Sequence, residues 1–227
     1  GGTASISPYT TNKESGHGPA WIISLFEDNA EHGLGMQIGY ETVRANLITK
    51  VEALKGKNAA LDAVIDTFLA TKNNTKANDE PAKALVAALE ASGCDEAKEI
   101  LKDKQYLAKK SFWIFGGDGW AYDIGYGGLD HVLASGHDVN VMVFDTEMYS
   151  NTGGQASKAS NIGEVCQFAA AGKEISKKSL SEIAMTYGYI YVAQIALGAN
   201  MNQADKAIAE AEAYPGPSLI IGYAPCE

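Results

Sequence analysis

The sequence is poor in cysteine and in basic residues, and it contains no long apolar segment. Its three cysteines, Cys94, Cys166 and Cys226, are widely spaced, which excludes a disulfide scaffold and a self-contained zinc or iron–sulfur site. No stretch approaches the roughly 18 apolar residues that a membrane-spanning helix needs. The formal net charge of −10 disfavours nucleic acids and anionic membranes as partners, because the long-range field repels polyanions.

The rest of the composition is typical of a folded protein. Hydrophobic residues make up 46% of the chain and charged residues 20%, which argues against disorder. A chain of 227 residues can bury the core of one α/β domain or of two small domains. The first residues, GGTASISPYTT, and the last, APCE, look like the ends of a segment cut from a longer chain, so we expect a fragment of a multidomain protein.

The first half of the chain contains three regions with different patterns. Residues 1–20 have little periodicity and predict an extended loop. Between residues 22 and 55 the apolar spacing predicts one or two helices, with Gly33 and Gly35 at a weak point or a close contact. Residues 56–110 predict a peripheral helical insertion of short amphipathic helices, with a polar loop at NNTKANDEP and a solvated charged face.

Beyond residue 110, apolar strands alternate with short helices. The predicted strands are SFWIFGG, VNVMVFD, YIYVAQIAL and SLIIGYAPC. The predicted helices are IGYGGLDHVLASG, which Gly136 closes, SLSEIAMTYG and MNQADKAIAEAEAYPG. Such alternation implies βαβ units with right-handed crossovers. We therefore expect an α/β fold, a mostly parallel sheet flanked by helices, in which residues 1–227 form one domain that carries the insertion.

Residues 116–128, GGDGWAYDIGYGG, form a glycine-rich segment directly after a predicted strand, which suggests a phosphate site. The dinucleotide motif G-x-G-x-x-G fails from Gly117, where the sequence is G-D-G-W-A-Y, and from Gly125, where it is G-Y-G-G-L-D. A P-loop needs G-K-[ST], and no lysine lies between residues 111 and 157. Both nucleotide-binding motifs are excluded.

Polar side chains at the ends of two predicted strands favour a diphosphate bound through a divalent metal. Asp118 follows the first strand, and Asp145 and Thr146 end the next, at the carboxyl edge where open α/β sheets bind ligands. If the two strands are neighbours, about 4.8 Å apart, Asp118 and Thr146 can reach one Mg²⁺, which prefers oxygen ligands. The glycines would let the backbone approach the phosphates. In the alternative interpretation, GGDG is only a turn and Thr146 only a helix cap.

At these residues the chain resembles the pyruvate:ferredoxin oxidoreductase family. The stretch GGDGWAYDIGYGGLDHVLASGHDVNVMVFDTEMYSNTGGQASKAS is similar to the thiamine-diphosphate motif of that family's C-terminal domain. The segments SPYTTN, GPAWIISLFEDNAEHGLGM, FAAAGK, MTYGYIYVAQIALG and PGPSLIIGYAPC are similar to it as well. The resemblance covers nearly the whole chain and is weakest from residue 56 to residue 105. It implies a thiamine-diphosphate-binding fold.

The resemblance also implies a set of metal and diphosphate ligands. Asp118 would give its carboxylate to Mg²⁺, Thr146 its hydroxyl and Met148 its backbone carbonyl. The family often has valine at the third position, a change that a main-chain ligand tolerates. Gly117 and Gly119 would border the diphosphate of the cofactor.

Further roles are implied at positions around this set. Asn151 would lie near the thiazolium ring and the substrate, as a catalytic and cofactor-binding residue. Trp120, Tyr122 and Tyr126 would line the cofactor pocket or pack in the core. Cys226 matches the last of four cysteines that bind a four-iron four-sulfur cluster next to the cofactor, and the other three would precede the first residue of this chain.

The implied reaction is the oxidative decarboxylation of pyruvate to acetyl-CoA and CO₂, with electrons passing through iron–sulfur clusters to ferredoxin or flavodoxin. The partners would be pyruvate, coenzyme A, the electron carrier and other domains of the same enzyme. The oligomeric state stays open, with a homodimer as one alternative. The location would be the cytoplasm or, alternatively, a hydrogenosome-like or mitochondrion-derived organelle. The family's pyrimidine-activating glutamate and its substrate-binding threonine and arginine belong to an N-terminal domain, so this chain alone would be inactive.

Two other functions stay open at this point. The chain could belong to a non-oxidative decarboxylase or synthase that uses the same cofactor, although Cys226 and DTEMYSNTGG argue against it because such an enzyme needs no cluster. It could also be an isolated domain that acts only as a folded module and binds no ligand.

Overall fold

The structure is a computed structural model, and it describes residues 26–226. This part of the chain falls into two compact units. The sheet unit contains the residues up to Leu34 and those from Phe112 onward, and the helical unit is Gly35–Ser111. The sequence passes from the first unit to the second within helix α1 (Asn29–Glu52). That residues 56–110 are an insertion stays a prediction.

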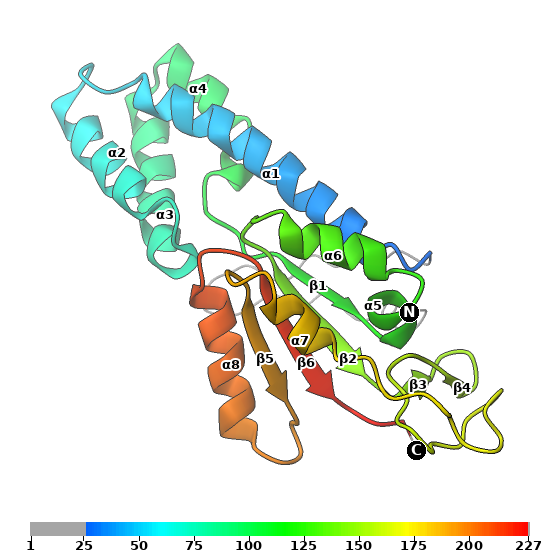
Figure 1. Ribbon diagram of the computed structural model, residues 1–227. Coiled ribbons are helices and arrows are strands. Elements are labelled where there is room, and N and C mark those ends of the chain that lie inside the picture. Colours follow the sequence, from blue (N-terminus) through cyan, green and yellow to red (C-terminus); the bar gives the residue numbers. More distant parts are fainter. Residues whose placement is uncertain (1–25, 227) are drawn as a thin grey trace. The chain divides into compact units, whose positions relative to one another are not determined.

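The helical unit contains the later turns of α1 and several shorter elements (Figure 1). These are α2 (Ala59–Thr71), α3 (Thr75–Ser92), α4 (Asp95–Leu101) and the 3-10 helix η2 (Lys104–Tyr106). Their common core is a cluster of buried apolar side chains that includes Leu47, Val51, Ile65, Phe68, Leu85, Leu89, Ile100 and Leu107. Arg44 is buried beside this core and donates to the carbonyls of Lys72 at 2.8 Å and Leu107 at 3.0 Å, which satisfies a charged group that would otherwise be costly to bury.

The predicted polar loop at NNTKANDEP is wrong, because most of this segment forms the start of α3. Asn74 caps the helix by accepting a hydrogen bond from a first-turn backbone N–H at 2.8 Å. Asn78 is fully buried and accepts from the guanidinium of Arg44 at 3.1 Å and from the backbone N–H of Lys109 at 2.9 Å. These tertiary hydrogen bonds outweigh the local preference of asparagine for turns, and α3 continues through Pro81.

The sheet unit is built on a four-stranded parallel sheet with the order β1-β2-β6-β5 (Figure 1). The strands are β1 (Trp113–Gly116), β2 (Asn140–Asp145), β5 (Tyr191–Ile195) and β6 (Ser218–Tyr223). A small antiparallel pair, β3 (Met148–Tyr149) with β4 (Gln155–Ala156), follows β2. The predicted α/β fold with a mostly parallel sheet is confirmed.

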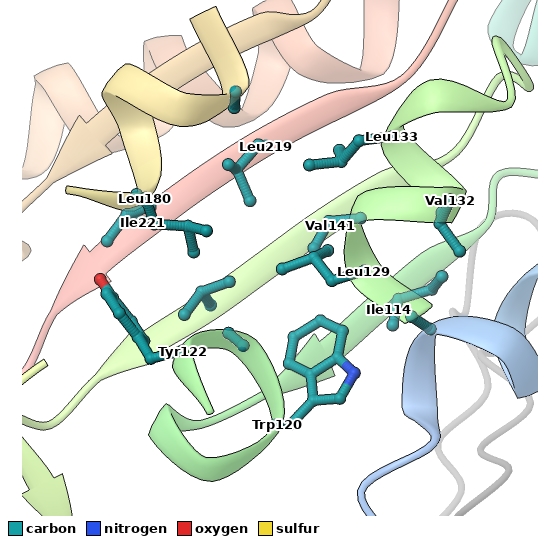
Figure 2. Close-up of a cluster of buried hydrophobic side chains, with 14 of the residues drawn as sticks. Ile114, Trp120, Tyr122, Leu129, Val132, Leu133, Val141, Leu180, Leu219 and Ile221 are labelled. Atoms are coloured by element: carbon teal, nitrogen blue, oxygen red, sulfur yellow. The ribbon is translucent and has the colours of Figure 1, made fainter. Parts of the chain in front are cut away.

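Helices cover both faces of this sheet, and the alternation of side chains along the strands decides which core each residue joins. The helices are α5 (Asp118–Tyr122), α6 (Tyr126–Ala134), α7 (Leu180–Met185) and α8 (Met201–Ala213). On one face Val141 and Leu219 pack with residues of α5, α6 and α7 (Figure 2). On the other face Met142 and Ile220 pack with Ala204 and neighbouring alanines of α8. The buried strands are therefore apolar at successive positions, as the sequence predicts.

Glycine at position 33 lets the start of α1, which belongs to the sheet unit, lie close to β1. A Cβ added to Gly33 would stand 2.5 Å from Cγ1 of Ile114, too close for any real side chain. Gly35 has no such neighbour within 4 Å. The close contact predicted for this pair is confirmed at Gly33. The predicted loop at residues 1–20 lies outside the described residues.

Candidate functional site

Two neighbouring strand ends bring Asp118 and Thr146 together. Strands β1 and β2 pair in parallel, with Gly116 opposite Val143, so the segments that follow them emerge at the same edge of the sheet. Asp118 is the first residue of α5, and Thr146 directly follows β2. The backbone N–H of Thr146 donates to Oδ1 of Asp118 at 3.0 Å. The sequence prediction that the two strands are neighbours and that these residues meet is confirmed.

Asp118 is a buried carboxylate whose two oxygens both accept hydrogen bonds. It is 3% exposed, and its Oδ2 accepts from the hydroxyl of Ser157 at 2.9 Å. Burial raises the pKa of Asp118 to about 6, against the lowering effect of the hydrogen bonds from Thr146 and Ser157. A carboxylate held this far from water gains strongly from a nearby cation, which restores its charged form.

The turn after β2 places a hydroxyl and a carbonyl side by side. The hydroxyl of Thr146 donates to the backbone carbonyl of Met148 at 2.9 Å. Two oxygen ligands at right angles around a Mg²⁺ with bonds of about 2.1 Å stand about 3.0 Å apart. The separation of these two oxygens therefore matches neighbouring positions in an octahedral site. With the Asp118 carboxylate they would supply an all-oxygen donor set of the kind that Mg²⁺ prefers.

The candidate metal set contains a single carboxylate. Within residues 26–226, no group of three or more His, Cys, Asp or Glu side chains is arranged to hold a metal ion. A cation at this edge would therefore take its remaining ligands from a bound anion and from water, which is how Mg²⁺ is usually held at phosphate sites. The ligand roles of Asp118, Thr146 and Met148 stay predictions.

A partly buried ion pair lies directly beside this set. Asp145, the last residue of β2, is 4% exposed, and Nζ of Lys177 lies 2.7 Å from its Oδ2. The hydroxyl of Tyr122 donates to the same carboxylate at 2.9 Å. Asp145 reaches the sheet edge as the sequence predicts, but its charge is already balanced by Lys177. Sequence reasoning missed Lys177 and Ser157 because neither belongs to a pattern that points toward a strand end.

The glycines of the segment 116–128 differ in what an added Cβ would meet. A Cβ at Gly116 would stand 2.2 Å from the ring of Trp120, and one at Gly125 would stand 2.6 Å from the Trp120 carbonyl, so both are needed for packing. At Gly117 the nearest atom to an added Cβ would be 3.9 Å away, and at Gly119 it would be 3.4 Å away. Packing therefore does not demand glycine at Gly117 or Gly119, and their predicted role beside a diphosphate stays a prediction.

The aromatic residues of this segment lie in different surroundings. Trp120 is fully buried, and its indole packs in the core with Ile114 and Leu129 (Figure 2). The indole is therefore not open to a ligand, and the predicted cofactor contact of Trp120 stays a prediction. Tyr122 is also buried and reaches Asp145 only with its hydroxyl. Tyr126 is partly buried against the same core.

The remaining predicted site residues, Asn151 and Cys226, lie in two segments near the turn that follows β2. Asn151 is exposed in the turn that joins β3 to β4, directly after the Met148 strand. The backbone N–H of Cys226 donates to the carbonyl of Thr146 at 3.2 Å, which places the main chain at Cys226 beside the candidate metal set. The thiol of Cys226 is free and half-buried. Its role as a cluster ligand and the catalytic role of Asn151 stay predictions.

Comparisons with known proteins give a family for this arrangement. Residues 101–221 match the family model described as thiamine pyrophosphate enzyme, C-terminal TPP binding domain; thiamine pyrophosphate is another name for thiamine diphosphate. The chain is 54% identical to a pyruvate:ferredoxin oxidoreductase of Moorella thermoacetica and 53% identical to a pyruvate-flavodoxin oxidoreductase of Enterobacter agglomerans. Both alignments cover 100% of this chain and 20% of the relative.

A solved structure of 2-oxoglutarate:ferredoxin oxidoreductase from Magnetococcus marinus aligns with a TM-score of 0.47 and 25% identity, over 51% of this chain and 40% of that one. The chain spans about a fifth of the length of the curated relatives it matches. In the part of the chain that the structure describes, no helix has both the length and the apolar character needed to cross a membrane. The resemblance inferred from the sequence is confirmed, and the chain belongs to the family of C-terminal thiamine-pyrophosphate-binding domains of thiamine pyrophosphate enzymes.

Proposed function

We propose that this chain is the cofactor-binding domain of a pyruvate oxidoreductase, and that it holds Mg²⁺ and the diphosphate of thiamine diphosphate. The observation that carries the proposal is the meeting of Asp118, Thr146 and Met148 at one edge of the sheet. The similarity of the whole chain to pyruvate:ferredoxin and pyruvate-flavodoxin oxidoreductases supports the same function. It also favours an oxidoreductase over a non-oxidative decarboxylase or an inert folded module.

Each residue of the metal set has a distinct part in this function. Asp118 supplies negative charge, and Ser157 and the N–H of Thr146 fix the orientation of its carboxylate. Thr146 supplies a hydroxyl oxygen and Met148 a carbonyl oxygen that is already turned toward the same point. When it is bound, thiamine diphosphate supplies the electron sink that decarboxylation of a 2-oxoacid requires. The chain's own residues bind the cofactor and hold it in place.

In the whole enzyme, we propose the oxidative decarboxylation of pyruvate to acetyl-CoA and CO₂, with ferredoxin or flavodoxin as electron acceptor. Cys226 would be one ligand of a four-iron four-sulfur cluster, and its hydrogen bond to Thr146 supports a short path between cofactor and cluster. Asn151 would act near the substrate. The proposal also includes other domains of the same enzyme as partners, a homodimeric assembly and a cytoplasmic location.

Calorimetric titration of the purified 227-residue chain with thiamine diphosphate tests the proposed binding. Wild-type protein should bind the cofactor when Mg²⁺ is present and lose binding when EDTA replaces the metal. Asp118→Asn should remove binding because it takes away the only charged ligand. Asp205→Asn, an exposed site in α8, is the matched control and should bind as wild type does. Equal binding by Asp118→Asn and wild type would contradict the proposal.

A further inference from the structure

We infer that Glu147 is a positioning residue for the metal site, an inference that rests on the proposed function. Glu147 stands between the two proposed ligands Thr146 and Met148, and its own carboxylate contacts Asn161, Tyr223 and Lys177. Its left-handed backbone conformation brings the Thr146 hydroxyl and the Met148 carbonyl to one side of the turn. Its carboxylate, anchored by neighbouring side chains, holds that conformation before a cation arrives.

The backbone of Glu147 is in a region that a side chain disfavours. Its φ is +65°, and left-handed conformations of this kind place the Cβ too close to the following carbonyl. Within residues 26–226 the other non-glycine residues with positive φ are Glu27 and Phe168, and neither adjoins a candidate metal ligand. A strained residue persists only where its surroundings hold it. The strained residue lies between the Thr146 hydroxyl and the Met148 carbonyl, whose oxygens are 2.9 Å apart.

Hydrogen bonds hold Glu147 from several directions. Oε1 accepts from the side-chain amide of Asn161 at 2.6 Å, and Oε2 accepts from the hydroxyl of Tyr223 at 3.3 Å. The backbone carbonyl of Glu147 accepts from the hydroxyl of Ser160. Its backbone N–H donates to Oδ1 of Asp145 at 3.3 Å. Both carboxylate oxygens and both main-chain polar groups of this strained residue are therefore engaged.

Lys177 links the two residues that flank Thr146. Its Nζ lies 2.7 Å from Oδ2 of Asp145 and 3.6 Å from Oε1 of Glu147. The side chain of Glu147 is 13% exposed, so water screens this pairing only in part. One ammonium group thus fixes the turn on both sides of the metal ligand. A turn fixed in this way does not have to be ordered when the cation binds, and preorganisation of this kind increases affinity.

Substitutions at position 147 separate the backbone role from an ordinary structural one. Glu147→Ala removes the carboxylate's contacts and keeps the Cβ that disfavours positive φ. Glu147→Gly also removes these contacts, but glycine adopts positive φ readily. If the carboxylate only stabilised the fold, neither substitution would change the Mn²⁺ affinity of the folded protein. If the backbone conformation presents the ligands, glycine should restore part of the affinity that alanine loses.

The test is titration of the 227-residue chain with Mn²⁺ in the presence of thiamine diphosphate, followed by electron paramagnetic resonance of the free ion. Thermal melting of each variant confirms that it is folded. We expect Glu147→Ala to bind Mn²⁺ about tenfold more weakly than wild type, with Glu147→Gly between the two. Asp205→Asn, which removes an exposed carboxylate far along the sequence, should leave the affinity unchanged.

Failure of this inference is distinguishable from failure of the proposed function. If wild-type protein binds no Mn²⁺ with the cofactor, the proposed function fails. If wild type binds and folded Glu147→Ala binds equally well, or if glycine at this position is no better than alanine, the role of Glu147 is overturned. If Glu147→Ala does not fold, Asn161→Ala removes one anchor from an exposed position. It should weaken Mn²⁺ binding about threefold, and unchanged affinity would overturn the inference.

Discussion

The N–H of Thr146 and the carboxylate of Asp118 form a hydrogen bond of 3.0 Å between the ends of two adjacent parallel strands. This contact fixes the loop after β2 against the start of α5 without help from a ligand. Burying the charged carboxylate of Asp118 without a cation lowers the free energy of unfolding, because desolvation disfavours its charge. The stability of the metal-free protein should therefore depend on pH.

The metal-free stability should fall as pH rises through the titration of Asp118. The pKa of this group is about 6 in the fold and 3.8 in the absence of the fold, so the native state binds its proton more tightly. A raised pKa contributes stability that is present below pH 3.8 and is lost as pH rises through 6. Measured in EDTA by urea unfolding, wild type should lose about 2 kcal/mol relative to Asp118→Asn between pH 4 and pH 7. A constant difference across this range would show that Asp118 is not desolvated.

Lys177→Met should destabilise the fold by about 3 kcal/mol, because it leaves the Asp145 carboxylate buried without its cation. The double variant Lys177→Met/Asp145→Asn removes both charges and should recover a large part of this loss. Guanidinium unfolding of the two single variants and the double variant gives the coupling between the residues. Additive effects would mean that the two charges do not interact.

Gly116→Ala should be strongly destabilising, because its Cβ would stand 2.2 Å from the ring of Trp120. The indole is fully buried in the core, so we expect overpacking to cost about 2 kcal/mol or more. Gly127→Ala is the matched control, since an added Cβ there meets no atom within 4 Å and the position lies in helix α6. It should be neutral or stabilise by up to about 1 kcal/mol. Thermal melting of both variants checks the contrast, which equal melting temperatures would contradict.

Asn78→Ala should loosen the helical unit and leave the sheet unit unaffected. It removes acceptors from the buried guanidinium of Arg44 and from the N–H of Lys109, at an expected cost of about 2 kcal/mol. Hydrogen exchange followed by mass spectrometry should show faster exchange within Gly35–Ser111 only. Faster exchange in the strands of the parallel sheet as well would mean that the chain unfolds as one cooperative unit.

Much of the sheet unit could be predicted from the sequence because its pattern is local. The strands of the sheet are short apolar runs, and the helices between them have helical spacing, so the order of elements follows directly. The position of Asp118 and Thr146 after successive strands then predicts that they meet, because parallel strands share an edge. The short helix α5 was not expected, since its five residues include the glycine of a segment typical of turns.

Other features depend on contacts between residues far apart in the sequence. Lys177 pairs with Asp145 across 32 positions, and no local pattern marks it. The helical start of α3 depends on Asn78 and its partners Arg44 and Lys109, which a propensity argument cannot weigh. The positive φ of Glu147 is equally hidden, because glutamate gives no sign of a left-handed backbone.

The hydrogen bond from Cys226 to Thr146 continues the pairing of β2 with β6 beyond the last residue of either strand. The main chain after β6 is therefore hydrogen-bonded to the loop that would bind the cation. In a longer polypeptide, a displacement of the main chain at residue 226 would act on the Thr146 carbonyl through this hydrogen bond. Movement of a neighbouring domain would then change the geometry of the proposed metal site at Thr146.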